Sequence, residues 1–234
     1  MQPYFLPFIG YFQLINNVDE FILYDDVNYI KKGWIDRNNI CFRGTVSKIK
    51  IPIQNVSQNK KINECYISQE GNWRFKLLKT IISYYGKHPN FEIISRNIIS
   101  IIEKIDFGDK ISILNYQLLS AITNYLGIST KISSTSQHYK NDMFLSGQDR
   151  IVDICKKANA KAYINPIKGI HLYDNQFFKN NKIELISFDY GVTPYYQLGN
   201  EKFVPNLSVL DILMNCDIEE INQKLLVNCN LISN

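Results

Sequence analysis

Two adjacent carboxylates, Asp25 and Asp26, are the residues of this chain whose type and position point most directly to chemistry. They close a mostly apolar run, residues 20–27, which is typical of a strand buried on both faces. Carboxylates at a strand end can orient sugar hydroxyls, ligate a metal or act as a general base. Aspartates that simply form the turn after a strand are the alternative. Because neighbouring strand residues point to opposite faces, we expect only one of the two to face a site.

Cationic and amide side chains follow these aspartates within a dozen residues. Lys31, Lys32, Arg37 and Asn38 lie in a polar loop. Lysine and arginine pair well with phosphate or carboxylate, and arginine can do so through two parallel hydrogen bonds. We interpret Lys32, Arg37 and Asn38 as candidate substrate-binding residues, with a solvated loop as the alternative.

Other predicted strands also end in polar residues. Ser133-Ser134, Asn165-Pro166 and Asp189-Tyr190 each follow an apolar run, and ligands of parallel α/β sheets bind beyond the carboxyl ends of the strands. We therefore predict that these ends converge on one cleft with Asp25. His171 lies in the loop 165–173 and is the best histidine candidate for acid–base chemistry.

Composition and missing motifs exclude several classes of protein. The net charge is +4 with no basic block, which does not favour nucleic-acid binding. No apolar run approaches the roughly 18 residues of a membrane helix, so we predict no membrane insertion and a cytoplasmic location. The five cysteines form no CxxC pair and suit reduced thiols. HExxH, GxSxG and Gly-rich phosphate loops are absent, so we predict no metal site and can name no cofactor.

The elements that must position these residues follow from periodicity. A hairpin is predicted over 39–53, and helices are predicted over 73–85, 91–105 and 112–126. Short strands then alternate with helical segments to about residue 215. This order indicates one α/β domain, residues 1–234, with a mainly parallel sheet flanked by helices. The hairpin, about 39–53, and the helices, about 73–127, would be insertions into it.

A set of short motifs spans nearly the whole chain in a fixed order. They are Gln2-Pro3-Tyr4, Pro7, Gly10-Tyr11-Phe12, Asp25-Asp26, Lys32, Arg37-Asn38, Asn165-Pro166 with Gly169 and Tyr173, Tyr196-Gln197, and Leu207-Ser208 with Asp211. Through these motifs the chain resembles the WbqC-like family of bacterial O-antigen and surface-polysaccharide gene clusters. The resemblance implies surface-polysaccharide biosynthesis, with a transferase acting on a nucleotide-linked sugar as the usual inference.

The resemblance also suggests roles for the candidate residues. Asp25 or Asp26 would orient or deprotonate the acceptor, while Lys32 and Arg37 hold a phosphate or carboxylate. Gln2, Tyr4 and Tyr11 would shape the pocket, and Asn165 with Tyr173 would close its other side. Family members usually begin with a short strand before the Gln-Pro motif. Here Met1 directly precedes that motif, so we expect the first strand to be missing, either by truncation or because the true start lies upstream.

Two further functions stay open. One is a nucleotidyl- or adenylate-forming enzyme, although the histidine-rich signature of that class is absent. The other is a non-catalytic binding protein of a glycan assembly complex. The ligand would be a nucleotide sugar or an acyl donor. If Asp25, Arg37, Asn165 and His171 share one cleft, an enzyme is favoured; if they are scattered, the binding protein gains.

Overall fold

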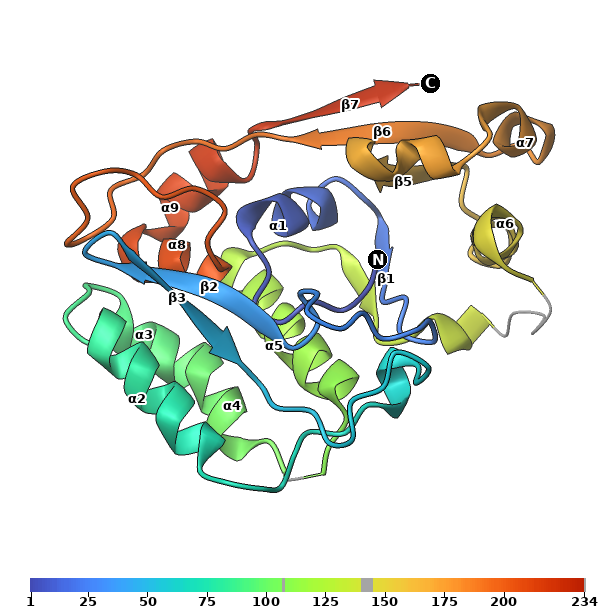
Figure 1. Cartoon of the computed structure of the whole chain (residues 1–234). Helices are drawn as coiled ribbons and strands as arrows, with labels where there is room; N and C mark the ends of the chain where they lie inside the picture. Colours follow the sequence, from blue (N-terminus) through green and yellow to red (C-terminus); the bar gives the residue numbers. More distant parts are fainter. Residues whose placement is uncertain (107, 140–144, 234) are drawn as a thin grey trace.

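The strands of the computed structural model form three small sheets within the described residues, 1–106, 108–139 and 145–233 (Figure 1). Two sheets hold a parallel pair and the third is an antiparallel hairpin. The pairs are β1 (Glu20–Ile22) with β4 (Lys131–Ser133), β2 (Arg37–Phe42) with β3 (Thr45–Lys50), and β5 (Ala162–Pro166) with β6 (Glu184–Tyr190), which also pairs antiparallel with β7 (Cys229–Ser233). The fold is thus mixed α/β.

The predicted single, mainly parallel sheet is not confirmed. Its parallel pairs are short and separate, because the strand expected over 20–27 ends at Ile22. Beyond that point the backbone pairs with loops: the Tyr24 amide donates to the carbonyl of Met1 at 2.7 Å, and the Asn63 amide donates to the carbonyl of Asp25 at 2.9 Å. The amino group of Met1 also donates to the Ile22 carbonyl at 2.9 Å. Met1 therefore lies beside β1, and the absence of a strand before the Gln-Pro motif stays a prediction.

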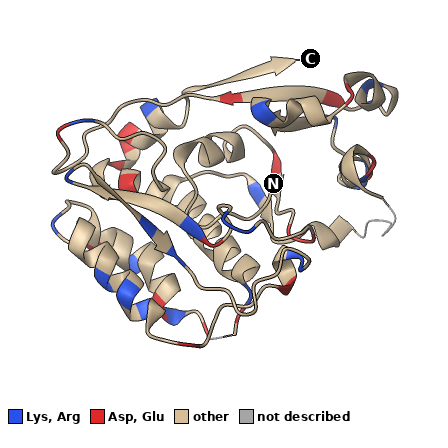
Figure 2. Ribbon diagram, in the orientation of Figure 1, with Lys and Arg blue, Asp and Glu red and all other residues tan. Residues whose placement is uncertain are grey.

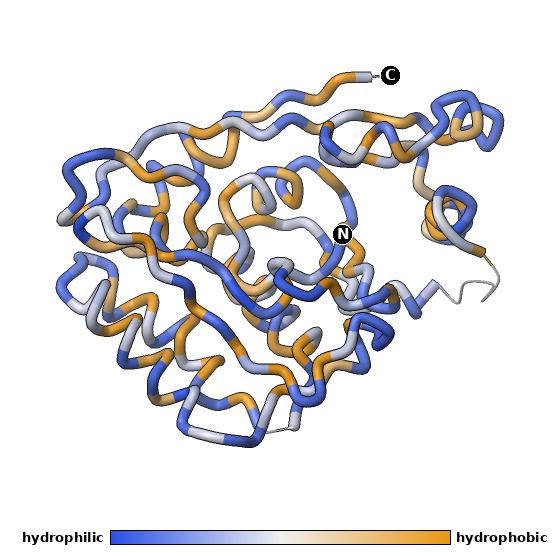
Figure 3. Tube along the Cα trace, in the orientation of Figure 1, coloured by the Kyte–Doolittle hydropathy of each residue, from blue (hydrophilic) through white to orange (hydrophobic). Residues whose placement is uncertain are grey.

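The helices predicted in the middle of the chain form one side of the molecule (Figure 1). They are α2 (Trp73–Tyr85), the continuous run of α3 (Phe91–Ile94), the π-helical η2 (Ser95–Ile99) and α4 (Ser100–Lys104), and α5 (Ile111–Leu126). Apolar and polar residues alternate around α2, as expected of a helix with one buried face (Figure 3). Gly127 ends α5 with φ of 71°, a left-handed cap that suits glycine. Whether these helices and the hairpin are insertions stays a prediction.

A smaller lobe follows, with an apolar core of its own. It contains α6 (Gly147–Lys157), η4 (Ile167–Leu172), α7 (Asn175–Asn180) and the strands β5 and β6. Val152, Cys155, Phe178, Ile183 and Leu185 are buried together in this core. Phe188, further along β6, belongs to the larger main core. The strand β6 therefore connects the two cores.

The remaining helical elements are short. They are α1 (Ile9–Ile15), η1 (Ile62–Glu64), η3 (Ser136–Tyr139), α8 (Val209–Asn215), α9 (Ile218–Glu220) and η5 (Ile221–Leu225). Of these, α1, η1, α8 and η5 contribute buried residues to the main core. All seven residues of α1 are buried, and this helix packs against β6. Basic residues follow one another along α2, at Arg74, Lys76 and Lys79 (Figure 2). Among the described residues, no helix is long and apolar enough to cross a membrane.

Candidate functional site

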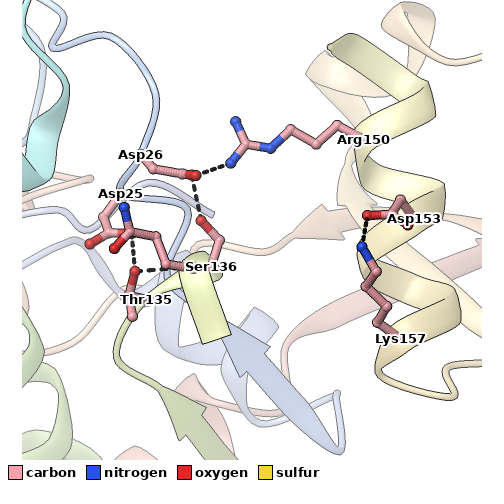
Figure 4. Close-up of polar contacts among 8 residues, drawn as sticks. Asp25, Asp26, Thr135, Ser136, Arg150, Asp153 and Lys157 are labelled. Atoms are coloured by element: carbon pink, nitrogen blue, oxygen red, sulfur yellow. Dashed lines mark hydrogen bonds and ion pairs between the residues drawn. The ribbon is translucent and has the colours of Figure 1, made fainter. Parts of the chain in front are cut away.

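Asp25 lies just beyond β1 and is almost completely buried, with 3% of its surface exposed. The hydroxyl of Thr135 donates a 2.6 Å hydrogen bond to its Oδ1 (Figure 4). Burial raises the pKa of the Asp25 carboxyl above its ordinary value, and the hydrogen bond from Thr135 opposes that rise. Asp25 is therefore a buried carboxyl group, fixed by Thr135, whose ionised form is disfavoured.

An open cleft of about 420 Å³ lies against this carboxyl group. Its lining comes from four places: the segment after β1, η1, the start of α5 with Lys110 before it, and the segment from the end of β4 into η3. The lining residues are Asp25, Asn63, Glu64, Lys110, Ser112, Ile113, Tyr116, Ser134, Thr135 and Gln137. Amides, hydroxyls and carboxylates dominate this surface, beside one tyrosine ring. Such groups can hydrogen-bond several hydroxyls at once, which suits a sugar or another polyol.

The start of α5 adds donors to the cleft. No side chain caps this 16-residue helix at its N-terminus. Ser112, in its first turn, is 4% exposed, and its hydroxyl has no hydrogen-bond partner among the described residues. Lys110 precedes the helix, and its amino group lies 5.9 Å from the Tyr66 ring centre. A helix N-terminus with a lysine beside it favours negatively charged ligand groups.

Asp26 faces away from this cleft, as the alternation along an extended chain leads one to expect. Its Oδ1 accepts a 2.5 Å hydrogen bond from the Ser136 hydroxyl, and its Oδ2 is ion-paired with Arg150 of α6 (Figure 4). The Arg150 guanidinium also lies over the Tyr24 ring, 4.8 Å from its centre. Asp26 thus joins the main body to the smaller lobe. No sequence motif pointed to Arg150, which is 124 positions from Asp26.

The end of β5 lies near this ion pair. Burial raises the pKa of the Tyr24 hydroxyl, Arg150 opposes the rise, and the Tyr173 hydroxyl adds to it. Tyr173 in turn lies 3.2 Å from the Tyr163 hydroxyl, which donates to Asn165 Oδ1 at 3.2 Å. A side chain at Gly169 would lie 2.7 Å from Asn165 Nδ2, so it would displace the Asn165 amide. Tyr163 therefore connects Asn165 with Tyr173, and neither Asn165 nor Tyr173 lines the Asp25 cleft.

The remaining predicted site residues lie elsewhere. His171 is exposed on η4, and Lys32 is exposed in its loop. Arg37 donates from Nε to Asp36 Oδ1 at 2.8 Å and from Nη2 to Asp36 Oδ2 at 3.1 Å. Asp25, Arg37, Asn165 and His171 therefore do not share one cleft among the described residues. Asp36, fully buried beneath Arg37, was not singled out by sequence reasoning, because its partner is its chain neighbour.

The N-terminal motif forms a tightly held loop. Tyr11 donates through its hydroxyl to the carbonyl of Gln2 at 2.8 Å, and the Tyr4 and Tyr11 ring centres are 5.6 Å apart. Asn38 donates through Nδ2 to the carbonyls of Phe5 at 3.1 Å and Leu6 at 2.7 Å. The Asn38 amide is thus taken up by the loop itself. Its predicted contact with a substrate, like those of Gln2, Tyr4 and Tyr11, stays a prediction.

Comparison with known proteins agrees with this motif order. The sequence profile of the WbqC-like protein family matches residues 2–223. The chain belongs to the WbqC-like family. It is 32% identical over 221 residues to an uncharacterised protein of Mycobacterium tuberculosis, covering 94% of this chain and 93% of that relative. A search of the solved structures found no match.

The late motif of this WbqC-like chain, Leu207-Ser208 with Asp211, is buried in the structure. Ser208 donates through its hydroxyl to the carbonyl of Leu6 at 2.8 Å. Asp211 is 1% exposed and accepts hydrogen bonds from the hydroxyls of Tyr85 at 2.8 Å and Tyr195 at 2.7 Å. The Gln197 amide adds a third, at 3.0 Å. These motif residues hold the N-terminal loop, α2 and the segment after β6 together. Among the described residues, no group of three or more His, Cys, Asp or Glu is arranged to hold a metal ion.

Proposed function

We propose that this WbqC-like protein is a transferase of bacterial surface-polysaccharide biosynthesis that modifies a nucleotide-linked sugar. The observation that carries the proposal is the Asp25 carboxyl group. It is buried at the edge of a polar cleft, its pKa is raised by that burial, and Thr135 fixes its orientation. Membership of the WbqC-like family supports the pathway, and the cleft supports the reaction class.

Asp25 would act as the general base of a group transfer. A hydroxyl or amino group of the sugar gives its proton to the Asp25 carboxylate and forms the new bond to the transferred acyl or glycosyl group. The bond between that group and its carrier breaks, and the carrier leaves with the electron pair. The amides of Asn63 and Gln137 would hold sugar hydroxyls, and Lys110 would offset the charge of a phosphate at the mouth.

The test uses nucleotide sugars with acyl donors, first for binding by thermal shift and then for turnover. In Asp25→Asn we expect binding to persist, because asparagine keeps the shape and accepts the hydrogen bond from Thr135. We expect turnover to fall by roughly 10²- to 10⁴-fold, the usual contribution of a general base. Asp189→Asn is the matched control, since Asp189 ends β6 outside the cleft. Equal turnover in Asp25→Asn and the wild type contradicts the proposal.

One observation favours a second function, a non-catalytic binding protein of a glycan assembly complex. Arg37, Asn165 and His171 do not join Asp25 in the cleft. A binding protein would bind a nucleotide sugar with no turnover for any donor and acceptor pair, and Asp25→Asn would then change only affinity. The same experiments therefore separate the two functions. The nucleotidyl- or adenylate-forming alternative stays a prediction.

A further inference from the structure

The N-terminal motif builds a second pocket, which the Asp25 chemistry does not use. This pocket has a volume of about 210 Å³. Tyr4, Pro7 and Phe8 of the N-terminal loop line it, together with Trp34 from the loop before β2 and Tyr190 from the end of β6. Its lining shares no residue with the Asp25 cleft. The densest motif of the chain therefore has a site of its own.

The loop that supports this pocket is held in an unusual conformation. Leu6 is 1% exposed and has φ of 42°, a left-handed region that a leucine rarely adopts. Its carbonyl accepts hydrogen bonds from both Asn38 and Ser208. The carbonyl of Pro3 accepts a further bond from Asn115 of α5 at 2.9 Å. Buried side chains from three elements thus fix a strained backbone, an arrangement that is concentrated at ligand sites.

The aromatic walls are equally constrained. The Phe8 and Tyr190 rings meet edge to face, with centres 4.8 Å apart. Gly10 makes this possible, because a side chain there would lie 2.5 Å from the Phe8 ring and 2.8 Å from the Tyr190 ring. The carbonyl of Trp34 accepts a hydrogen bond from the Phe5 amide at 2.9 Å, while the Trp34 residue remains 46% exposed. The pocket is a fixed aromatic surface open to a ligand.

The polar groups of the pocket are neutral, and although the Asn38 amide is bonded to the Phe5 and Leu6 carbonyls, other groups have no partner among the described residues. No Asp, Glu, Lys or Arg is among its lining residues. The Trp34 indole N–H, the Tyr190 hydroxyl and the Asn206 amide make no hydrogen bond to any described residue, and all three belong to the lining. Neutral donors and acceptors around aromatic faces suit a flat, uncharged ring with polar edges, and a nucleobase is such a ring. The Asp25 cleft differs, because it contains two carboxylates and a lysine.

Two cations lie in the loop that also carries Trp34. Lys31 and Lys32 are exposed, precede Trp34 in the same loop, and form no ion pair with a described residue. The pocket also lies near the Asp25 cleft along the backbone. Met1 is hydrogen-bonded to Tyr24, and Tyr4 is only three residues away, a span of at most about 11 Å. The N-terminal segment therefore connects the residues of the two sites.

We propose that the pocket between Trp34 and Tyr190 binds the base of a nucleotide, with Lys31 and Lys32 holding its phosphates. The sugar then reaches toward the Asp25 cleft. This inference rests on the proposed function in making the ligand a nucleotide-linked sugar, and it adds which part of the chain recognises the nucleotide. It also returns Tyr4 and Lys32 to a substrate-binding role, at a different site from that of Asp25.

The test reads Trp34 directly. The chain has two tryptophans, so Trp73→Phe leaves Trp34 as the fluorescent reporter, excited at a wavelength where nucleotides absorb little. The probes are the diphosphates of uridine, thymidine, cytidine, guanosine and adenosine, with pyrophosphate and free N-acetylglucosamine as comparisons. We expect saturable quenching by at least one nucleoside diphosphate and none by pyrophosphate or the free sugar.

Variants then locate the site by calorimetry. Trp34→Leu and Tyr190→Leu should each weaken binding of that nucleoside diphosphate by tenfold or more, and Lys32→Ala should weaken it most at low salt. Phe75→Leu, on the exposed face of α2, is the matched control and should leave affinity unchanged. Tyr190→Phe keeps the ring and tests the hydroxyl alone.

Several outcomes overturn the inference. They are unchanged affinity in Trp34→Leu, equal quenching by the free sugar, and no binding of any nucleoside diphosphate. The proposed function fails separately. If Asp25→Asn keeps full turnover while Trp34→Leu loses nucleotide binding, the base pocket stands and the Asp25 chemistry does not. If Trp34→Leu binds and turns over nucleotide sugar normally while Asp25→Asn does not, the reverse holds.

Discussion

Two adjacent aspartates acquire different surroundings in this fold. Asp25 lines a cleft and accepts a hydrogen bond from the Thr135 hydroxyl, whereas Asp26 is ion-paired with Arg150. Chemistry is therefore assigned to Asp25 and attachment of the smaller lobe to Asp26. The assignment depends on the burial of Asp25, which forms no ion pair among the described residues, so that its ionised form is disfavoured.

That cost predicts how Asp25→Asn changes stability with pH. Because the pKa of Asp25 is raised in the folded protein, the unfolded chain loses this proton first as pH rises. The wild type thus loses stability as pH rises from the ordinary aspartate pKa through the folded value, and the Asp25→Asn variant does not. We expect the two proteins to converge in acid, and the variant to be more stable by an amount on the order of 1 kcal/mol at neutral pH.

Urea unfolding of the two proteins across this pH range measures the difference. Asp189→Asn should run parallel to the wild type, since Asp189 is partly exposed at the end of β6. A variant that is less stable than the wild type at neutral pH would show that Asp25 is a structural carboxylate, stabilised by its hydrogen bonds more than burial disfavours it.

At the scale of elements, hydrogen bonds from α8 and its N-cap hold the N-terminal loop and α2 in place. The Ser208 hydroxyl caps α8 by accepting a hydrogen bond from the Leu210 amide, and it donates one to the Leu6 carbonyl. The Val209 amide donates to the Pro7 carbonyl at 2.9 Å. One turn later, Asp211 collects three donors from α2 and the segment after β6. A short helix with six buried residues therefore connects distant parts of the chain.

Replacing Asp211 by alanine should show how much this hydrogen-bond network contributes to the free energy of unfolding. The change leaves the Tyr85 and Tyr195 hydroxyls and the Gln197 amide without their acceptor in a buried place. We expect a loss of about 3–5 kcal/mol in the free energy of unfolding, as for other disrupted buried networks. Tyr195→Phe removes a single donor and should cost only about 1 kcal/mol. Chemical denaturation measures both, and similar small losses in the two variants would mean that water replaces the network.

Sequence periodicity predicted the helices well and the site only in part. The helix predicted over 73–85 matches α2 because Leu77, Ile81 and Tyr85 all face the core. The strand predicted over 20–27 ends early because Asp25 and its backbone bond to Thr135 and Asn63 instead of a neighbouring strand. The sequence around Ser112 predicts only the start of a helix, and nothing in it indicates that Ser112 lines the Asp25 cleft. Contacts between residues this far apart leave no local pattern to detect.

At the scale of the whole molecule, the strand β6 contributes residues to both apolar cores. The ion pair between Arg150 and Asp26 is a second connection between the smaller lobe and the main body. The smaller core holds Leu185 and the larger holds Phe188. Arg150 reaches from α6 to Asp26, where the two side chains are 13% and 11% exposed (Figure 4). The lobe is therefore held by the continuous backbone of β6 and by this ion pair from α6. We expect the ion pair to stabilise the position of α6 against the main body.

Removing the Arg150 side chain should loosen the lobe more than the main body. Arg150→Ala leaves Asp26 with a mostly buried charge, so we expect a loss of about 2–4 kcal/mol, concentrated in the lobe. Hydrogen exchange should accelerate over α6 and β5 and stay near wild type in α5.

Asp153→Ala is the control. It breaks the Lys157–Asp153 pair of α6, which is far more exposed, and should cost less than about 0.5 kcal/mol (Figure 4). In the reversed pair Asp26→Arg with Arg150→Asp, part of the lost protection should return, because attraction is restored although the geometry is not. Uniform acceleration across α5 and α6 would instead mean that the two cores unfold as one unit, and that β6 alone couples them.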